Sequence, residues 1–282
     1  MFNNLTNLIQ KPLPRQLRNW VRVQKPYFFL LETDLDLLIG SGINISELRR
    51  CYKAKFIGDS DILETIFEIH FGAVLSRIGS RLCFHPQKSE HSKKNYDFKI
   101  AIESVQLHFE MKTRKDMFPF TPGKREPEAN GRRETVDRRF LGGTNDGTSE
   151  STILRGIIDK ALIQLPDIGP NFVVIGQIYS HSIAEALKNI DMAIFGDIIH
   201  YTERGNPNGL LTGRLFNGIF NCDEKAGRYN KLNGIIWQYL EKNHGKLREY
   251  SHVFFNKATS TRTPAHIDEL INRTFTRNSD QL

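Results

Sequence analysis

The apolar run at residues 172–175 constrains the fold of this chain more than any other segment. Four consecutive hydrophobic residues stand between Asn171 and Gly176, two residue types that favour turns. A short continuous run of this kind is typical of a strand buried on both faces, and such strands are most common in parallel sheets. Residues 151–165, which precede it, repeat apolar side chains at helical spacing. This order predicts an α/β protein.

The other patterns agree with an α/β plan, a central mixed β-sheet flanked by helices. Residues 60–78 carry apolar side chains three and four apart, which predicts a helix of nearly five turns with Ser60 or Asp61 as its N-cap. Apolar and polar residues alternate at 96–102 and 106–113, and a turn near Glu103 would fold these segments into a hairpin. The remaining predicted elements are a strand at 81–85, a helix at 182–200, a late hairpin of 235–240 with 250–256 across a turn at 242–245, and a helix at 266–273.

The chain is divided into two regions by these patterns. Residues 1–57 mix basic and aromatic side chains, and we predict a mainly helical N-terminal extension there. Residues 58–282 are predicted to form one domain, with the core motifs at 60–180 and a C-terminal helix and hairpin as elaboration. Residues 113–149 are rich in Gly, Pro and Arg and are predicted to be a long loop. Its arginines would either bracket a backbone phosphate or belong to a solvated loop.

Composition narrows the choice of partners and compartment. The net charge is +7 and the sequence pI is about 9.3. Such a balance favours polyanionic partners such as DNA, although many mildly basic proteins never bind nucleic acid. No window approaches the roughly 18 uninterrupted apolar residues that a membrane span requires, and no signal peptide is recognisable. The three cysteines follow no disulfide or zinc spacing, so we expect a cytoplasmic protein.

The most chemically informative residues lie in the predicted hairpin. Residues two apart on a strand share a face, so Glu110 and Lys112 point the same way, while Phe109 and Met111 point to the opposite side, into a core. The hairpin places Asp97 opposite residues 110–112, on the face of Glu110 and Lys112. Two carboxylates and an ammonium group at one place can hold a metal ion and orient a water molecule beside a phosphate.

The order of these residues resembles the PD-(D/E)xK nuclease superfamily, which has the restriction-endonuclease-like fold. The likeness covers roughly residues 60–180. It rests on an ordered set: Glu68 in a helix, Asp97 in a strand, then Glu110-Met111-Lys112, then a helix with Lys160 and Gln164 and the buried strand at 171. The chain departs from the family in having Asn95-Tyr96 where the family name places Pro before Asp, and in its long 113–149 segment.

The resemblance implies a magnesium-dependent or manganese-dependent enzyme. Asp97, Glu110, the carbonyl of Met111 and Glu68 would be the metal ligands. Lys112 would position the attacking water or stabilise charge in the transition state. Gln164 and Lys160 would support the site or touch the scissile phosphate. All six side chains are therefore candidate catalytic residues: Asp97, Glu110, Lys112, Glu68, Gln164 and Lys160.

The resulting functional hypothesis is a DNA endonuclease, most plausibly a bacterial restriction or defence nuclease. A homodimer is expected because cutting both strands of a duplex usually requires two active sites. Two alternatives remain open: a catalytically inactive nucleic-acid-binding or assembly protein with the same fold, and an RNA nuclease.

Several residues have competing interpretations. Glu64 competes with Glu68 for the helix position of the metal site, and the spacing to Gly79 favours Glu68. Lys160 and Gln164 can equally belong to a surface face of their helix. His70 falls within an apolar stripe and is predicted to be a core histidine with its hydrogen bonds satisfied. The last group, Cys83, His85 and His91, lacks the second cysteine pair of a zinc site, and we assign it no metal.

Overall fold

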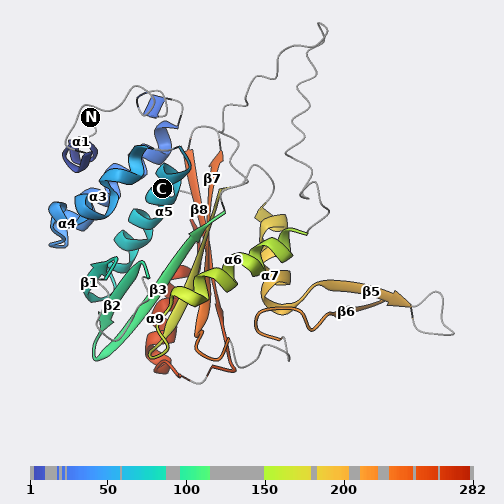
Figure 1. The fold of residues 1–282 in the computed structure, drawn as a ribbon. Coiled ribbons are helices and arrows are strands. Elements are labelled where there is room, and N and C mark those ends of the chain that lie inside the picture. The colour runs from blue at the N-terminus through green and yellow to red at the C-terminus, as the bar shows by residue number, and fades with distance from the viewer. Residues whose placement is uncertain are drawn as a thin grey trace, which may run out of the picture.

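The computed structural model describes residues 3–9, 18, 21–22, 24–57, 59–86, 96–114, 149–178, 183–202, 210–221, 229–243, 246–259 and 261–279. In this part of the chain a seven-stranded mixed sheet lies between two layers of helices (Figure 1). The predicted α/β class, with a central mixed sheet flanked by helices, is confirmed. No helix among these residues combines the length and the apolar character that crossing a membrane requires.

The helices and strands follow one another along the chain as in Figure 1. The helices are α1 (Asn3–Ile9), α3 (Lys25–Gly40), α4 (Ile45–Tyr52), the 3₁₀ helix η1 (Lys53–Ile57), α5 (Asp59–Leu75), α6 (Glu150–Gln164), α7 (Ile183–Phe195) and α9 (Ala265–Phe275). The strands are β1 (Ser80–Phe84), β2 (Phe98–Ile102), β3 (Val105–Thr113), β4 (Asn171–Ile178), β5 (Ile198–Thr202), β6 (Leu210–Arg214), β7 (Gly234–Asn243), β8 (Lys246–Phe255) and β9 (Arg277–Ser279).

The central sheet has the strand order β1-β2-β3-β4-β7-β8-β9. Strands β1, β2 and β3 pair antiparallel, β4 pairs parallel with both β3 and β7, and β8 and β9 continue antiparallel. The predicted buried strand is therefore β4, at the centre of the sheet, and the predicted early and late hairpins are β2–β3 and β7–β8. The helix α6 makes the crossover between β3 and β4, which explains how two neighbouring parallel strands are connected.

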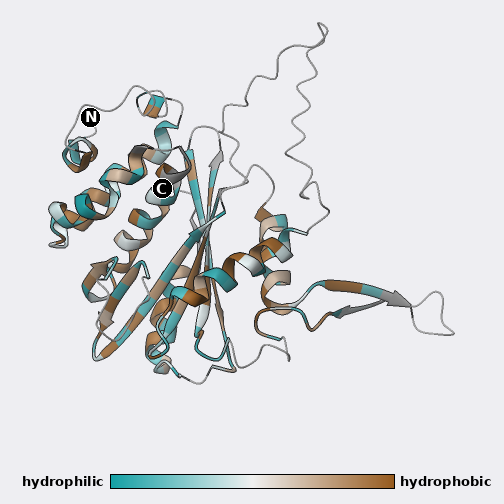
Figure 2. Ribbon diagram, in the orientation of Figure 1, coloured by the Kyte–Doolittle hydropathy of each residue, from teal (hydrophilic) through white to brown (hydrophobic). Residues whose placement is uncertain are grey.

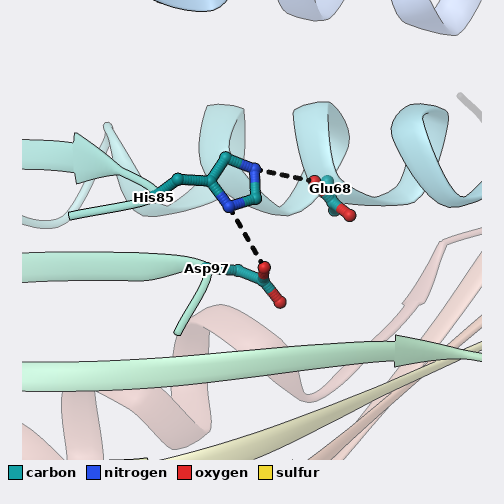
Figure 3. A group of neighbouring side chains, drawn as sticks. All are labelled: Glu68, His85 and Asp97. Carbon is teal, nitrogen blue, oxygen red and sulfur yellow. Dashed lines mark ion pairs between the residues drawn. The ribbon is translucent and has the colours of Figure 1, made fainter. Parts of the chain in front are cut away.

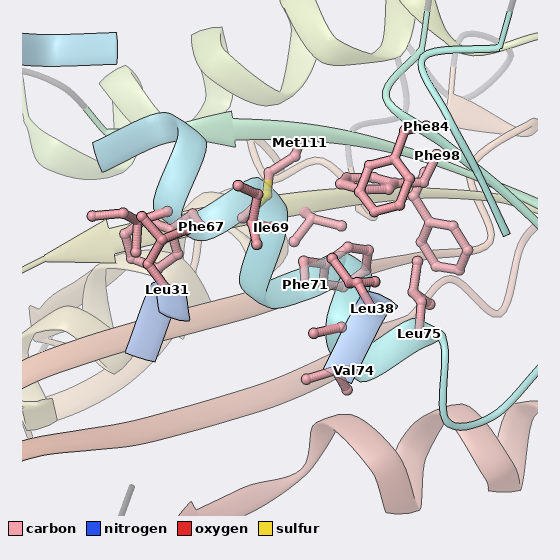
Figure 4. Close-up of a cluster of buried hydrophobic side chains, with 14 of the residues drawn as sticks. Leu31, Leu38, Phe67, Ile69, Phe71, Val74, Leu75, Phe84, Phe98 and Met111 are labelled. Carbon is pink, nitrogen blue, oxygen red and sulfur yellow. The ribbon is translucent and has the colours of Figure 1, made fainter. Parts of the chain in front are cut away.

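Two hydrophobic cores cover the two faces of the sheet. On one face α5 packs between α3 and the sheet (Figure 4). Phe71 of α5 has its ring centroid 5.3 Å from that of Phe98 and 5.4 Å from that of Phe109. On the other face α6 and α7 pack against alternate residues of β4, Val173 and Ile175. Hydrophobic and hydrophilic residues are interspersed along α3, α4 and α6, as expected for helices with one buried side (Figure 2).

The N-terminal helices belong to the first of these cores. Residues of α1, α3 and α4 pack in the same cluster as α5 and the sheet, and buried members include Leu5, Leu31, Leu38 and Leu48. A short turn joins two of these helices, because α3 ends at Gly40 and α4 begins at Ile45.

Some predicted boundaries are wrong. The helix predicted to reach residue 200 ends at Phe195, because Gly196 has a φ of +99° and terminates it. Residues 198–202 instead form β5, which pairs with β6 in a separate two-stranded sheet that projects from the body in Figure 1. Similarly, α5 runs from Asp59 to Leu75 rather than 60–78, so neither Ser60 nor Asp61 is its cap.

The late hairpin and the first strand of the early hairpin also differ in detail. Strand β7 extends through Asn243, so two residues expected in the turn pair with β8 instead. Strand β2 begins at Phe98, which leaves Asp97 just outside the strand rather than within it.

His70 is buried in the core, as predicted, but its hydrogen bonds are only partly satisfied, because Nε2 makes none within the described residues. Its Nδ1 lies 2.9 Å from Asp34 Oδ2 of α3, and its Nε2 lies 3.2 Å from Glu249 Oε1 of β8. Burial alone would lower the pKa of His70, but attraction to the Asp34 and Glu249 carboxylates outweighs burial and raises the pKa to about 10. The imidazolium therefore ties α3 and α5 to the sheet through two buried ion pairs.

We expect His70→Leu to lower the free energy of unfolding by about 3–5 kcal/mol, because it leaves two carboxylates buried without their cation. Urea denaturation followed by circular dichroism measures this change. The control is His252→Leu, which alters an exposed histidine on β8 and should change stability by less than about 0.5 kcal/mol. Equal effects of the two substitutions would show that the buried ion pairs do not stabilise the fold.

Candidate metal centre

The candidate site lies where β2 ends and β3 continues. The pairing of the two strands ends at Phe98 and Phe109, whereas β3 runs on to Thr113. Asp97 bridges this end of the pairing in two ways. Its backbone N–H donates to the Phe109 carbonyl at 3.1 Å, and its Oδ2 accepts from the Met111 backbone N–H at 2.8 Å. The Asp97 carboxylate thus takes the place of the next strand residue as acceptor, which fixes it against β3.

Glu110 and Lys112 lie on the face of β3 that is covered by α6. Their register partners on β4 are Val173 and Ile175, which belong to the core beneath α6. Glu110 is fully buried, and its Oε1 accepts from the Lys112 ammonium. Lys112 Nζ also lies 3.3 Å from Gln164 Oε1 on α6. We expected this face of β3 to lie outside the core, but α6 covers it. Glu110 and Lys112 contact each other beneath that helix.

Glu68 reaches the same region from α5, on the other face of the sheet. Its side chain is buried, and Lys55 Nζ of η1 lies 2.8 and 3.0 Å from its two oxygens. Gly176 of β4 allows the close approach of α5, because a Cβ there would lie 2.9 Å from the ring of Phe67. The absence of a side chain at residue 176 therefore helps to bring Glu68 close to the sheet.

His85 connects the two carboxylates of Glu68 and Asp97 (Figure 3). It follows β1, and its backbone N–H donates to the Asp97 carbonyl at 2.7 Å. The ring Nε2 is 3.3 Å from Glu68 Oε2, and the ring Nδ1 is 3.3 Å from Asp97 Oδ1. Ligand atoms of these three residues all lie within 4.8 Å of one another, which is a spacing that a single metal ion can bridge.

The electrostatics of the site are those of crowded acids. Burial, followed by repulsion from Asp97, raises the pKa of Glu110 to about 9, although Lys112 opposes this shift. Burial would also raise the pKa of Asp97, but hydrogen bonds from His85 and the Met111 amide, with the charges of His85 and Lys112, lower it instead. Burial lowers the pKa of His85, yet its contacts with Asp97 and Glu68 outweigh burial and raise the pKa to about 9. Glu110 therefore holds a proton at neutral pH, while Asp97 is ionised.

One oxygen of the Glu110 side chain has no partner among the described residues. Glu110 Oε2 is buried and has no hydrogen-bond partner in the described part of the chain. The raised pKa of Glu110 leaves this carboxyl group protonated at neutral pH, so a cation that bound Oε2 would have to displace the proton. The oxygens of Glu110, Asp97 and Glu68 are hard ligands of the kind that Mg²⁺ and Mn²⁺ prefer. The three predicted acidic ligands thus come from α5, from the residue before β2 and from β3. Of these, Glu68 and Asp97, together with His85, have ligand atoms within 4.8 Å of one another.

Some of the other predicted site residues contact the site and others do not. Gln164 reaches Lys112, but Lys160, one turn earlier on α6, is exposed and has no hydrogen bond or ion pair within the described residues. Glu64 is half-buried and contributes to the electrostatic field at Lys112 and at Lys55, whereas Glu68 makes the direct contacts. Met111, whose carbonyl is a predicted metal ligand, lies at the site, because its backbone N–H donates to Asp97.

Two residues at the site were not expected from the sequence. Lys55 lies in the N-terminal extension, and no motif connects it to Glu68. The sequence groups His85 with Cys83 and His91, but Cys83 lines a separate cavity of about 290 Å³ with Arg81 and Lys99. His91 lies outside the described residues, so the grouping with it is not placed. The signal for His85 was its position directly after a short strand adjacent to the Asp97 strand, which brings the two side chains together.

A buried ion pair fixes β3 relative to α6. Arg114, directly after β3, donates from Nε and one terminal nitrogen to the two oxygens of Glu150, at 2.9 Å each. Glu150 is the first residue of α6. Such two-pronged pairing is geometrically specific, and it holds the end of β3 that carries Lys112 close to the helix that carries Gln164. The arginines predicted to bracket a phosphate between residues 113 and 149 lie outside the described residues.

Comparisons of this chain with models of protein families, with curated proteins and with solved structures found no match.

We expect Glu110→Gln to stabilise the metal-free protein at about pH 8, by about 1–2 kcal/mol. Because the pKa of Glu110 is raised to about 9, the folded state keeps the carboxyl protonated at this pH, whereas the unfolded chain ionises it near its ordinary pKa of 4.5. The wild-type protein therefore loses stability as the pH rises from 4.5 toward 9. The amide does not titrate, so its advantage should shrink as the pH falls toward 5.

Urea denaturation in the presence of a chelator, at several pH values, measures this effect. Glu269→Gln is the matched control, because Glu269 is exposed on α9. A stability gain for Glu110→Gln that is independent of pH, or no gain at all, would contradict the protonation assigned to Glu110.

Proposed function

We propose that this protein is a divalent-cation-dependent nuclease of the PD-(D/E)xK type that hydrolyses DNA phosphodiester bonds. The observation that carries the proposal is the buried Glu110 carboxylate, with one oxygen paired to Lys112 and the other unpartnered, beside the Asp97 carboxylate. The proposal includes the restriction-endonuclease-like fold, a role in restriction or defence, a cytoplasmic location and a homodimer.

The arrangement supports hydrolysis of a phosphodiester through named roles. Asp97, Glu110 and Glu68 would hold Mg²⁺ or Mn²⁺, with the Met111 carbonyl as a further ligand. When bound, the ion supplies positive charge that stabilises the phosphoryl oxygens in the transition state and acidifies an attacking water. Lys112, held by Glu110 and Gln164, orients that water and offers a second positive charge. Gln164 positions the Lys112 ammonium rather than reacting itself.

The surroundings of the site agree with a polyanionic substrate. The net charge is +7, and Lys112 side-chain exposure of 26% leaves its ammonium within reach of a ligand while Glu110 stays buried. Lys160 is exposed on α6, the helix that carries Gln164, and is assigned to contact with the phosphate backbone beyond the scissile bond. Charge contacts of this kind make binding to nucleic acid fall as salt increases.

A second function is favoured by one observation. Glu68 and Asp97 already have cationic partners in Lys55 and His85, so a purely structural ion-pair network explains these two carboxylates. A nucleic-acid-binding or assembly protein that has lost catalysis would retain such a network. It would leave the unpartnered Glu110 oxygen without a purpose, and we therefore place the nuclease first.

We expect Asp97→Asn and Lys112→Ala each to lower the rate of Mg²⁺-dependent or Mn²⁺-dependent DNA cleavage by at least about 100-fold. DNA affinity measured without metal should change by less than about threefold, because neither residue is assigned to backbone binding. Cleavage of labelled single-stranded DNA, double-stranded DNA and RNA measures the rates and separates a DNA nuclease from an RNA nuclease. Lys257→Ala, which removes an exposed lysine after β8, is the control and should cleave at the wild-type rate.

If the wild-type protein binds DNA but cleaves none of these substrates with either metal, the non-catalytic function replaces the nuclease. If Lys112→Ala retains the wild-type rate, the role assigned to Lys112 is wrong.

A further inference from the structure

The cavity of about 290 Å³ on strands β1 to β3 is separate from the candidate metal centre. Its walls are formed by Arg81, Cys83, Lys99, Ile100, Ala101 and Gln106. Lys99 pairs in register with His108, which lies on the same face of β3 as Glu110, so the cavity is on the side of the sheet that carries α6. The helix α6 packs on β3 and β4, and β1 and β2 lie beside it (Figure 1). None of the proposed metal ligands lines this cavity.

A β-bulge in the edge strand β1 holds Arg81 at the cavity. Between the pairs Ser80–Ala101 and Cys83–Lys99, two residues of β1 lie opposite a single residue of β2. Arg81, one of these two, has a φ of +56°, a left-handed conformation that bulges of this kind usually give to glycine. An arginine carries a conformational cost here that glycine would avoid, so the fold alone does not explain it. Residues held in such conformations often contact a ligand.

Lys99 is a half-buried cation that makes no side-chain hydrogen bond or ion pair within the described residues. Its charge acts on the neighbouring groups. Burial, followed by the charge of Lys99, lowers the pKa of His108 to about 4. Burial, followed by the Glu47 carboxylate, raises the pKa of Cys83, and Lys99 opposes this shift. No lining residue is acidic, so the positive charge of the wall is not balanced within it.

We propose that this cavity is a phosphate-binding site that takes a nucleotide, with Arg81 and Lys99 paired to a phosphate monoester. Arginine can bind two phosphate oxygens at once through its planar fork, and lysine adds a compact charge. The exposed side-chain amide of Gln106 is a third donor. The three donors stand on three neighbouring strands, and a phosphate monoester presents three acceptor oxygens to them, whereas a carboxylate presents two.

The size of the cavity suits more than a bare anion. One molecule of liquid water occupies about 30 Å³, so a cavity of about 290 Å³ has room for roughly ten water molecules, or for a phosphate with its sugar. The methyl group of Ala101 gives the sugar an apolar wall.

A phosphate monoester at this cavity has two sources, a free mononucleotide or the phosphorylated end of a nucleic-acid strand. Lys99 stands two residues beyond Asp97, which corresponds to roughly 7 Å along an extended chain. A strand with its terminal phosphate in the cavity can therefore also reach the metal centre. This second source rests on the proposed function, whereas a free nucleotide does not.

Equilibrium dialysis of the full chain against labelled thymidine 5′-monophosphate, with a chelator present, tests the inference without metal. We expect saturable binding that weakens as salt rises and that thymidine, which lacks the phosphate, does not compete with. Lys99→Gln should weaken this binding by at least about tenfold, because it removes a charge-assisted hydrogen bond. Lys257→Gln removes an exposed lysine after β8 and should change the affinity by less than about twofold.

Arg81→Gly separates ligand binding from folding. Because glycine adopts the left-handed conformation without strain, the midpoint of thermal unfolding should change by no more than about 2–4 °C. The affinity for thymidine 5′-monophosphate should nevertheless fall by at least about tenfold.

The thiol of Cys83 reports where the nucleotide binds. Saturating thymidine 5′-monophosphate should slow the alkylation of Cys83 by iodoacetamide severalfold, as measured by mass spectrometry of peptides. Alkylation of Cys51, which packs with the other core of the sheet, should keep its rate and serves as the internal control.

Competition by oligonucleotides with and without a 5′-phosphate separates the two sources. If only the phosphorylated oligonucleotide displaces the nucleotide and protects Cys83, the site takes strand ends. If neither does, its ligand is a free nucleotide. The inference is overturned if Lys99→Gln and Arg81→Gly both keep the wild-type affinity, or if the saturating nucleotide leaves Cys83 unprotected.

These outcomes are distinct from those of the proposed function. A protein that binds the nucleotide at this cavity but cleaves no nucleic acid retains the phosphate site and loses the nuclease proposal. A protein that cleaves DNA but does not bind the nucleotide here retains the nuclease and loses the phosphate site.

Discussion

The hydrogen bond from the Met111 amide to Asp97 Oδ2 is the interaction on which the arrangement of the site depends. Strand β2 ends at Phe98, and β3 continues beyond it with backbone groups that need partners. By accepting from the Met111 amide, the Asp97 carboxylate satisfies one of these groups and is held beside Glu110 in the same step. The backbone carbonyl of Asp97 meanwhile anchors His85. One residue at a strand end therefore connects the sheet, the acid pair and the histidine.

Bringing these acidic groups together is electrostatically unfavourable, and contacts elsewhere in the fold hold them in place. Buried carboxylates repel one another, and the raised pKa of Glu110 expresses that repulsion. Rigid supports hold the groups together in spite of it: the Arg114–Glu150 ion pair fixes β3 against α6, and Gly176 allows α5 to pack closely. Repulsion between ionisable groups that is concentrated at one place, within a fold whose hydrophobic pattern is otherwise regular, is typical of functional sites.

The sequence predicted the parts of this fold that follow from local periodicity. The run at 172–175 predicted β4 because a strand covered on both faces has no polar alternation, and the alternation at 106–113 gave the sides to which Glu110 and Met111 point. Other features depend on contacts between distant segments, which no local pattern encodes. Lys55 meets Glu68 only because η1 packs on α5, and residues 198–202 form a strand because Gly196 ends the preceding helix.

The charges around Glu68, Asp97 and Glu110 explain why the same geometry agrees with two functions. Three acids face three basic groups, Lys55, His85 and Lys112, so the network can be neutral without any ion. Burial and repulsion from Asp97 raise the pKa of Glu110 to about 9, and the contacts of His85 with Asp97 and Glu68 outweigh burial and raise its pKa to about 9. A divalent ion that bound Glu110 would displace the proton held there. Because metal binding to protonated ligands releases their protons, cation binding at this network would strengthen as the pH rises.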